Sequence, residues 1–118
     1  MAVAVTGTDI DVVLAMRELG KEIHAIATQK GWWDTDRSVG EVLALIHSEV
    51  SECLEAFREG NPSDIHCPDF SAAEIELADV CVRVMDFAEK MHYRLPEAII
   101  AKVAFNRDRP HKHGGKLF

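Results

Sequence analysis

The sequence predicts an all-α fold, a small four-helix bundle-like protomer with an extended basic C-terminal tail. Apolar residues recur at helical spacing in four segments. Ser or Thr stands three positions before an acid where three of these segments begin, as in a helix capping box. No segment shows the alternating pattern of a strand. We expect residues 1–118 to form a single domain, because domains typically contain about 100 to 150 residues.

The first predicted helix begins after Thr8, whose side chain can cap it together with Asp11. It runs to about Lys30, and Gly31 stops it. This leaves residues 1–8 as an N-terminal extension.

The second and third predicted helices each follow a Ser that stands three positions before a Glu. The second covers about Val39–Arg58 after Ser38, and a Gly-Asn-Pro sequence ends it. The third follows Ser71 and runs to about His92. It is apolar nearly all round, which predicts a central helix packed on several sides.

The fourth predicted helix starts at Pro96, which suits the first turn of a helix, and continues through Phe105. Pro110 and the Gly114-Gly115 pair then favour an extended tail, so we assign residues 107–118 to a C-terminal tail.

The composition favours a cytoplasmic protein with no membrane partner and no stable nucleic-acid partner. The formal charge of −7 argues against general binding to nucleic acid. No apolar stretch reaches the roughly 18 residues of a membrane span, and no basic segment typical of a signal peptide is evident. The cysteines, Cys53, Cys67 and Cys81, are odd in number, which indicates reduced thiols rather than a disulfide framework.

Two pairs of acids stand inside otherwise apolar helical stretches. Glu49 and Glu52 lie three positions apart in the second predicted helix, and Glu76 and Asp79 have the same spacing in the third. Each pair therefore lies on one face of its helix, and antiparallel packing would bring the pairs together. Glutamates at this spacing are commonly solvated, but neither stretch offers an obvious polar stripe.

Four clustered carboxylates would need a compensating charge. Two carboxylates about 4 Å apart repel by roughly 4 kcal/mol at an effective dielectric of about 20. Arg83 is the only basic residue one turn from Asp79. Oxygen ligands suit Mg²⁺, for which Mn²⁺ can substitute, and Mg²⁺ commonly combines carboxylates with substrate phosphates. The acids therefore predict a divalent metal site.

Basic residues gather near the end of the sequence, where they could bind phosphate. Lys102 and Asn106 lie four positions apart and share a face of the fourth predicted helix. Gly114 and Gly115 would permit close approach of the backbone. A tail without fixed structure is the alternative. The other candidate phosphate contacts are Arg107, Arg109, Lys112, His113 and Lys116.

The ordered set of motifs resembles the MazG-like nucleotide pyrophosphohydrolases of the all-α NTP pyrophosphatase superfamily. The set comprises Glu49-x-x-Glu52, Glu76-Leu-Ala-Asp79, Lys102-x-x-x-Asn106-Arg107-x-Arg109-Pro110 and His113-Gly114-Gly115-Lys116. The similarity covers roughly residues 20–118, including the Gly31-Trp32-Trp33-Asp34 connection.

The resemblance implies hydrolysis of a nucleoside triphosphate, and of a deoxynucleotide in particular, to a monophosphate and pyrophosphate. Glu49, Glu52, Glu76 and Asp79 match the acids that bind metal in that family, and catalysis would depend on them. His24 and Trp33 match positions that contact the base in some relatives. Trp32 could replace Trp33, and a core histidine with a packing tryptophan is the alternative. The family also implies a homodimer or homotetramer.

Three other functions remain open from the residues alone. A ferritin-like di-metal protein would need two E-x-x-H motifs, and only Glu89-x-x-His92 fits, far along the helix from Asp79. A non-enzymatic helical module could bind a partner through the basic tail, although it leaves the acids unexplained. A zinc site would have no standard spacing and would use His66, Cys67, His111 and His113.

Overall fold

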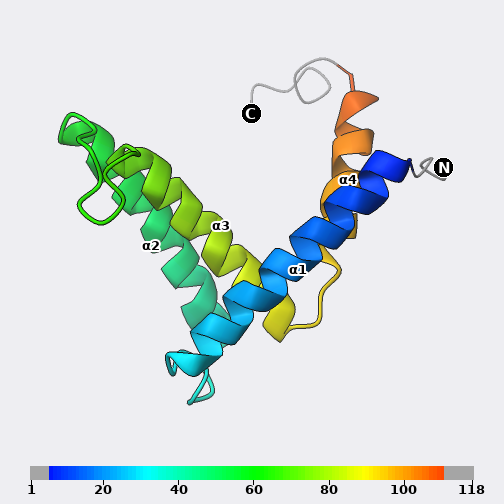
Figure 1. The fold of residues 1–118 in the computed structure, drawn as a ribbon, viewed down its shortest axis with the longest axis horizontal. Coiled ribbons are helices and arrows are strands. Elements are labelled where there is room, and N and C mark those ends of the chain that lie inside the picture. The colour runs from blue at the N-terminus through cyan, green and yellow to red at the C-terminus, as the bar shows by residue number, and fades with distance from the viewer. Residues whose placement is uncertain (1–5, 111–118) are drawn as a thin grey trace.

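A computed structural model describes residues 6–110, which form four α-helices and no β-strand. The all-α prediction is confirmed. The helices are α1 (Gly7–Gln29), α2 (Val39–Arg58), α3 (Ala72–Lys90) and α4 (Leu95–Arg107). Figure 1 shows α2 and α3 side by side and antiparallel, α1 crossing α3, and α4 beside the N-terminal half of α1.

The predicted starts of α2 and α3 are confirmed, and the predicted start of α1 is wrong. Helix α4 begins at Leu95, one residue before the predicted Pro96, and includes Arg107, which the prediction assigned to the tail. Ser38 and Ser71 cap α2 and α3, and a proline occupies the first turn of α4. The capping residue of α1 is Thr6, whose hydroxyl accepts a hydrogen bond from the Asp9 backbone, and not Thr8. Both threonines precede an aspartate by three positions, so the sequence allowed either register. Residues 7 and 8 therefore belong to α1 and not to an N-terminal extension.

The first three helices end in the same way, with paired backbone hydrogen bonds that close a Schellman motif. At the end of α3 the N–H of Tyr93 donates to the Ala88 carbonyl at 2.9 Å, and His92 adopts a left-handed backbone with φ of 56°. His92 therefore lies beyond the helix, which is shorter than predicted. Gly31 and Gly60 occupy the equivalent left-handed positions after α1 and α2, with φ of 85° and 86°.

Asn61 connects the end of α2 to the start of α3. Its side-chain carbonyl accepts a hydrogen bond from the Ala73 backbone N–H at 2.9 Å, and its own N–H donates to the Ala56 carbonyl at 2.7 Å. Ala56, Ala73 and Cys53 form a small buried cluster beneath this junction. These contacts fix the register between α2 and α3, and with it the relative position of the two acidic pairs.

The prediction that the third helix is central is confirmed, because α3 packs against both α2 and α1. The buried core of the described residues is nevertheless small. Its buried apolar members are Val42, Cys53, Ala56, Ala73 and Ala88. Large apolar side chains remain exposed along α2 and α3, including Val50, Leu54, Phe57, Leu77 and Val82. None of the described helices is long and apolar enough to cross a membrane.

Candidate functional site

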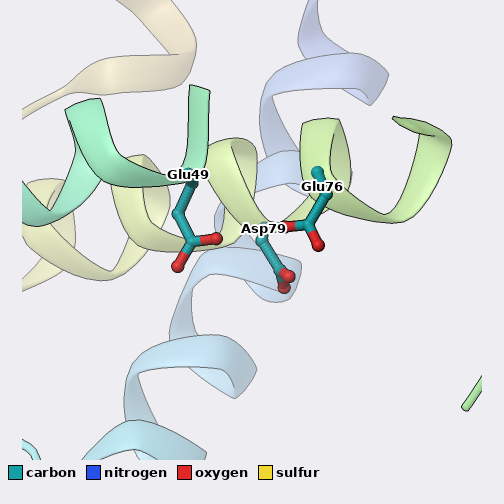
Figure 2. A group of neighbouring side chains, drawn as sticks. All are labelled: Glu49, Glu76 and Asp79. Atoms are coloured by element: carbon teal, nitrogen blue, oxygen red, sulfur yellow. The ribbon is translucent and has the colours of Figure 1, made fainter. Parts of the chain in front are cut away.

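Three of the four predicted acids meet between α2 and α3. Glu49 from α2 and Glu76 and Asp79 from α3 can each place one carboxylate oxygen within 4.8 Å of the others. Figure 2 shows the three side chains turned toward the same space. The spacing within α3 and the antiparallel packing of α2 produce this arrangement, as the sequence predicts. Within residues 6–110 it is the one cluster of acids, histidines or cysteines with the geometry to hold a metal ion.

Glu52, the fourth acid, lies beside this trio but is more exposed. A hydrogen bond with Glu49, partial burial and the nearby carboxylate charges together raise the pKa of Glu52 to about 7. The pKa values of Glu76 and Asp79 are also raised, first by burial and then by neighbouring carboxylates. These acids therefore repel one another in the metal-free protein.

Arg83 supplies the cation closest to the trio. Its Nε donates a hydrogen bond of 2.6 Å to Oε1 of Glu49. Burial alone would raise the pKa of Glu49, but the hydrogen bond and charge of Arg83 bring it below the usual value. Glu49 is thus the one member of the trio whose pKa is lowered rather than raised.

The donor set fits a hard divalent cation. Oε2 of Glu76 is buried and has no hydrogen-bond partner among the described residues. A buried carboxylate oxygen without a partner is costly, and a cation would satisfy it. All three side chains offer oxygen, which Mg²⁺ and Mn²⁺ prefer over softer metals. Glu49, Glu76 and Asp79 could therefore hold such an ion, with Glu52 beside it.

A cleft of about 290 Å³ opens next to the acids. One part of its lining comes from α2 and α3, and the rest comes from α1 and the connection that follows it. Acids and cations both face this space. Its lining residues are Ile23, Ile26, Ala27, Lys30, Trp32, Arg37, Glu49, Asp79, Val82, Arg83 and Asp86.

His24 and Trp33, the predicted base contacts, converge on a residue that sequence analysis missed. His24 Nδ1 lies 2.7 Å from Asp86 Oδ1, and Trp33 Nε1 donates to both carboxylate oxygens of Asp86 at 3.0 and 3.1 Å. The rings of His24 and Trp33 are 6.0 Å apart and tilted by 60°. Asp86 follows Asp79 by two helical turns in the same apolar stretch, and that spacing is the signal that could have revealed it.

The predicted phosphate contacts on α4 are not brought to the acids within this protomer. The helix packs against α1, where Glu97 pairs with Arg17, and none of its residues lines the cleft (Figure 1). Lys102 Nζ instead lies 4.7 Å from the centroid of the Phe105 ring. Asn106, Arg107 and Arg109 follow on the same helix and its end. Lys112, His113 and Lys116 lie outside the described residues.

Comparison with curated proteins finds two relatives, both named dCTP pyrophosphatase 1, from Rattus norvegicus and Mus musculus. Each is 30% identical to this chain over 95 residues. The match covers 75% of the chain and 55% of each relative, so the chain spans about half the length of these proteins. The similarity supports a relationship to nucleotide pyrophosphohydrolases. No family model matches the chain, and no solved structure gives a match.

The two alternative metal sites gain no support from the part of the chain that the structure describes. His92 lies past the end of α3, so Glu89 and His92 do not share a helical face as a di-metal motif requires. His66 and Cys67 lie exposed in the connection between α2 and α3. His111 and His113, the other proposed zinc ligands, fall outside residues 6–110.

The raised pKa of Glu52 predicts how the stability of the metal-free protein depends on pH. In the folded state the pKa of Glu52 is about 7, whereas the usual pKa of a glutamate is 4.5. Its contribution to stability is complete below the lower value and is lost as pH rises through the higher one. We expect the Tm of the metal-free protein to fall between about pH 5 and about pH 8, and to fall less in Glu52→Gln.

The matched control is Glu55→Gln, since Glu55 is exposed on the same helix and meets only Arg58 among the described residues, at 3.8 Å. This variant should follow the parent. Glu76 and Asp79 change the pH dependence of stability in the same direction as Glu52, whereas Glu49 changes it in the opposite direction. The informative quantity is therefore the difference in Tm between variant and parent at each pH. Identical pH profiles for parent and Glu52→Gln would contradict the electrostatic description of the site.

Proposed function

We propose that the chain is a MazG-like, metal-dependent nucleoside triphosphate pyrophosphohydrolase. It would convert a (d)NTP and water into a (d)NMP and pyrophosphate. The observation that carries this proposal is the trio of Glu49, Glu76 and Asp79, with a buried unpartnered oxygen, at the edge of a cleft that also contains cations. The similarity to proteins named dCTP pyrophosphatase 1 supports the reaction class.

In this proposal Glu49, Glu76 and Asp79 hold Mg²⁺, or Mn²⁺ in its place. A bound divalent ion supplies charge for the phosphates and lowers the pKa of a coordinated water. Glu52 lies beside the trio and is open to solvent, so it is placed to orient the attacking water or to take its proton. The attack would occur at the α-phosphorus, and pyrophosphate would leave.

The base would bind near His24 and Trp33. Both rings are held by the single carboxylate of Asp86, which fixes their orientation toward one another. Trp32, the alternative to Trp33, lines the cleft with an exposed indole that offers a flat surface for stacking on a nucleobase. Because the relatives are named for dCTP, a cytosine deoxynucleotide is the first substrate to test.

Apolar faces of the helices support a proposed homodimer or homotetramer. Leu54 and Phe57 on α2 are 58% and 61% exposed, and Leu77 on α3 is 53% exposed. Burial of such side chains against a second copy would be favourable. Since α4 stands away from the cleft, any contact of Lys102 or Asn106 with the substrate would come from another protomer.

We expect light scattering to give a mass of two or four times the protomer mass of 13.1 kDa. Charge introduced on the exposed face of α2, as in Phe57→Glu, should shift the protein toward the monomer, because a buried unpaired charge is costly. Ile65→Glu is the control, since Ile65 is 90% exposed in the connection between α2 and α3. A parent protein that stays monomeric at all concentrations would refute the proposed assembly.

The proposed reaction predicts release of pyrophosphate from a nucleoside triphosphate panel in the presence of Mg²⁺ or Mn²⁺. Glu49→Gln and Asp79→Asn should each lower kcat/KM by about 100-fold or more, since even residues that support metal ligands indirectly contribute 10- to 100-fold, roughly. Glu55→Gln is the matched control and should retain parental activity. No pyrophosphate from any nucleotide, or full activity in both acid variants, would overturn the proposed function.

A further inference from the structure

Three cations line the same cleft as the acids, and all belong to parts of the chain other than α4. Lys30 directly follows α1, Arg37 lies in the connection before α2, and Arg83 lies on α3. Both arginines lie near Trp32, with their guanidinium carbons 6.0 and 5.7 Å from its ring centroid. The cleft therefore combines a place for a divalent cation with a nearby group of positive charges.

Arg37 contacts Trp33, and its Nε has no hydrogen-bond partner among the described residues. Its guanidinium carbon lies 4.2 Å from the centroid of the Trp33 ring, which is close enough for a cation–π interaction. Its Nε is buried and has no hydrogen-bond partner within residues 6–110, where Arg37 also forms no ion pair. A buried donor without a partner is costly, so a ligand that supplies acceptor oxygens would satisfy it.

Arg83 donates one hydrogen bond to Glu49 through its Nε, and its other N–H groups are available to a ligand. Its Nε is bonded to Glu49, while the guanidinium also faces the ring of Trp32 and lines the cleft. An arginine carries five N–H donors, so Arg83 can contact both a metal-binding acid and a ligand in the cleft. This position joins the acidic trio to the part of the cleft around Arg37.

We propose that Arg37 and Arg83 bind the phosphate chain of the nucleotide within the same protomer. Resting on the proposed function, this inference gives the two arginines the role that the sequence suggested for Lys102 and the basic tail. A planar guanidinium can bind two phosphate oxygens at once, and its hydrogen bonds to an anion are stronger than neutral ones. Trp33 restricts Arg37 before binding, which lowers the entropic cost of ordering its side chain.

The test uses inorganic tripolyphosphate with Mg²⁺ as a probe that contains the phosphate chain and no base. The chain has two tryptophans, and both lie next to Arg37, so tryptophan fluorescence can follow binding. Calorimetry provides an independent measurement. Arg37→Gln and Arg83→Gln should each weaken binding of tripolyphosphate by about 10-fold or more, as expected for a lost hydrogen bond to a charged group. Arg37→Lys should lie between Arg37→Gln and the parent, because it keeps the charge but loses the two-oxygen contact.

Arg58→Gln is the charge-matched control. Arg58 lies at the exposed end of α2 and contacts Glu55 at 3.8 Å, so this variant should bind tripolyphosphate as the parent does. Thermal unfolding of each variant separates loss of binding from loss of folding. Because Arg83 donates a hydrogen bond to Glu49, Mn²⁺ binding without phosphate is also measured in Arg83→Gln, and tripolyphosphate binding is compared at saturating Mg²⁺.

Four results would overturn the inference. In the first, tripolyphosphate does not bind the parent. In the second, Arg37→Gln and Arg83→Gln both bind it as the parent does. In the third, Lys102→Gln loses binding and both arginine variants retain it. In the fourth, Arg37→Gln loses binding of a nucleoside but keeps binding of tripolyphosphate, which would assign Arg37 to the base instead of the phosphates. Asp79-dependent hydrolysis with parental tripolyphosphate binding in the arginine variants would leave the proposed function standing. Tripolyphosphate binding that depends on the arginines, without hydrolysis of any nucleotide, would support the inference and overturn the proposed function.

Discussion

The crowding of carboxylates between α2 and α3 is the constraint on which the site depends. Carboxylate oxygens of three acids lie within 4.8 Å of one another, namely those of Glu49, Glu76 and Asp79. Within residues 6–110 these acids form a single ion pair, between Glu49 and Arg83. One cation cannot compensate three carboxylates and Glu52 beside them. Burial raises the pKa values of Glu76 and Asp79, a hydrogen bond with Glu49 raises that of Glu52, and the remaining repulsion adds to all three shifts. A divalent ion would remove it, and the adjacent cleft would give a phosphate access to that ion.

The backbone around the site has to hold the two acidic helices in one register. Asn61 does so at one end, because it bonds the last turn of α2 and the first turn of α3. At the other end, Gly31 turns the chain after α1 in a left-handed conformation and brings Trp32 and Arg37 to the cleft. An alanine at Gly31 would meet the Asp34 carboxylate at 3.0 Å as well as an unfavourable φ. Helix ends therefore determine which side chains reach the acids.

Local signals predicted the helices well and indicated which helix faces carry the acids, because capping residues and three-residue spacing act within a single turn. The same locality explains the wrong start of α1, where Thr6 and Thr8 offer the same motif. Such local signals do not predict contacts between residues that are far apart in the sequence. No sequence pattern indicates that Asp86 joins His24 and Trp33, or that Arg37 faces the cleft. The crossing of α1 over α3 determines these relationships.

The most direct test of this account is a titration of the metal-free protein with Mn²⁺, followed by electron paramagnetic resonance of the free ion. The parent should remove Mn²⁺ from solution through Glu49, Glu76 and Asp79, and Asp79→Asn should remove much less. Mg²⁺ should compete for the same site. An undiminished free-ion signal with the parent, or equal Mn²⁺ binding by the parent and Asp79→Asn, would contradict the claim that these carboxylates form a metal site.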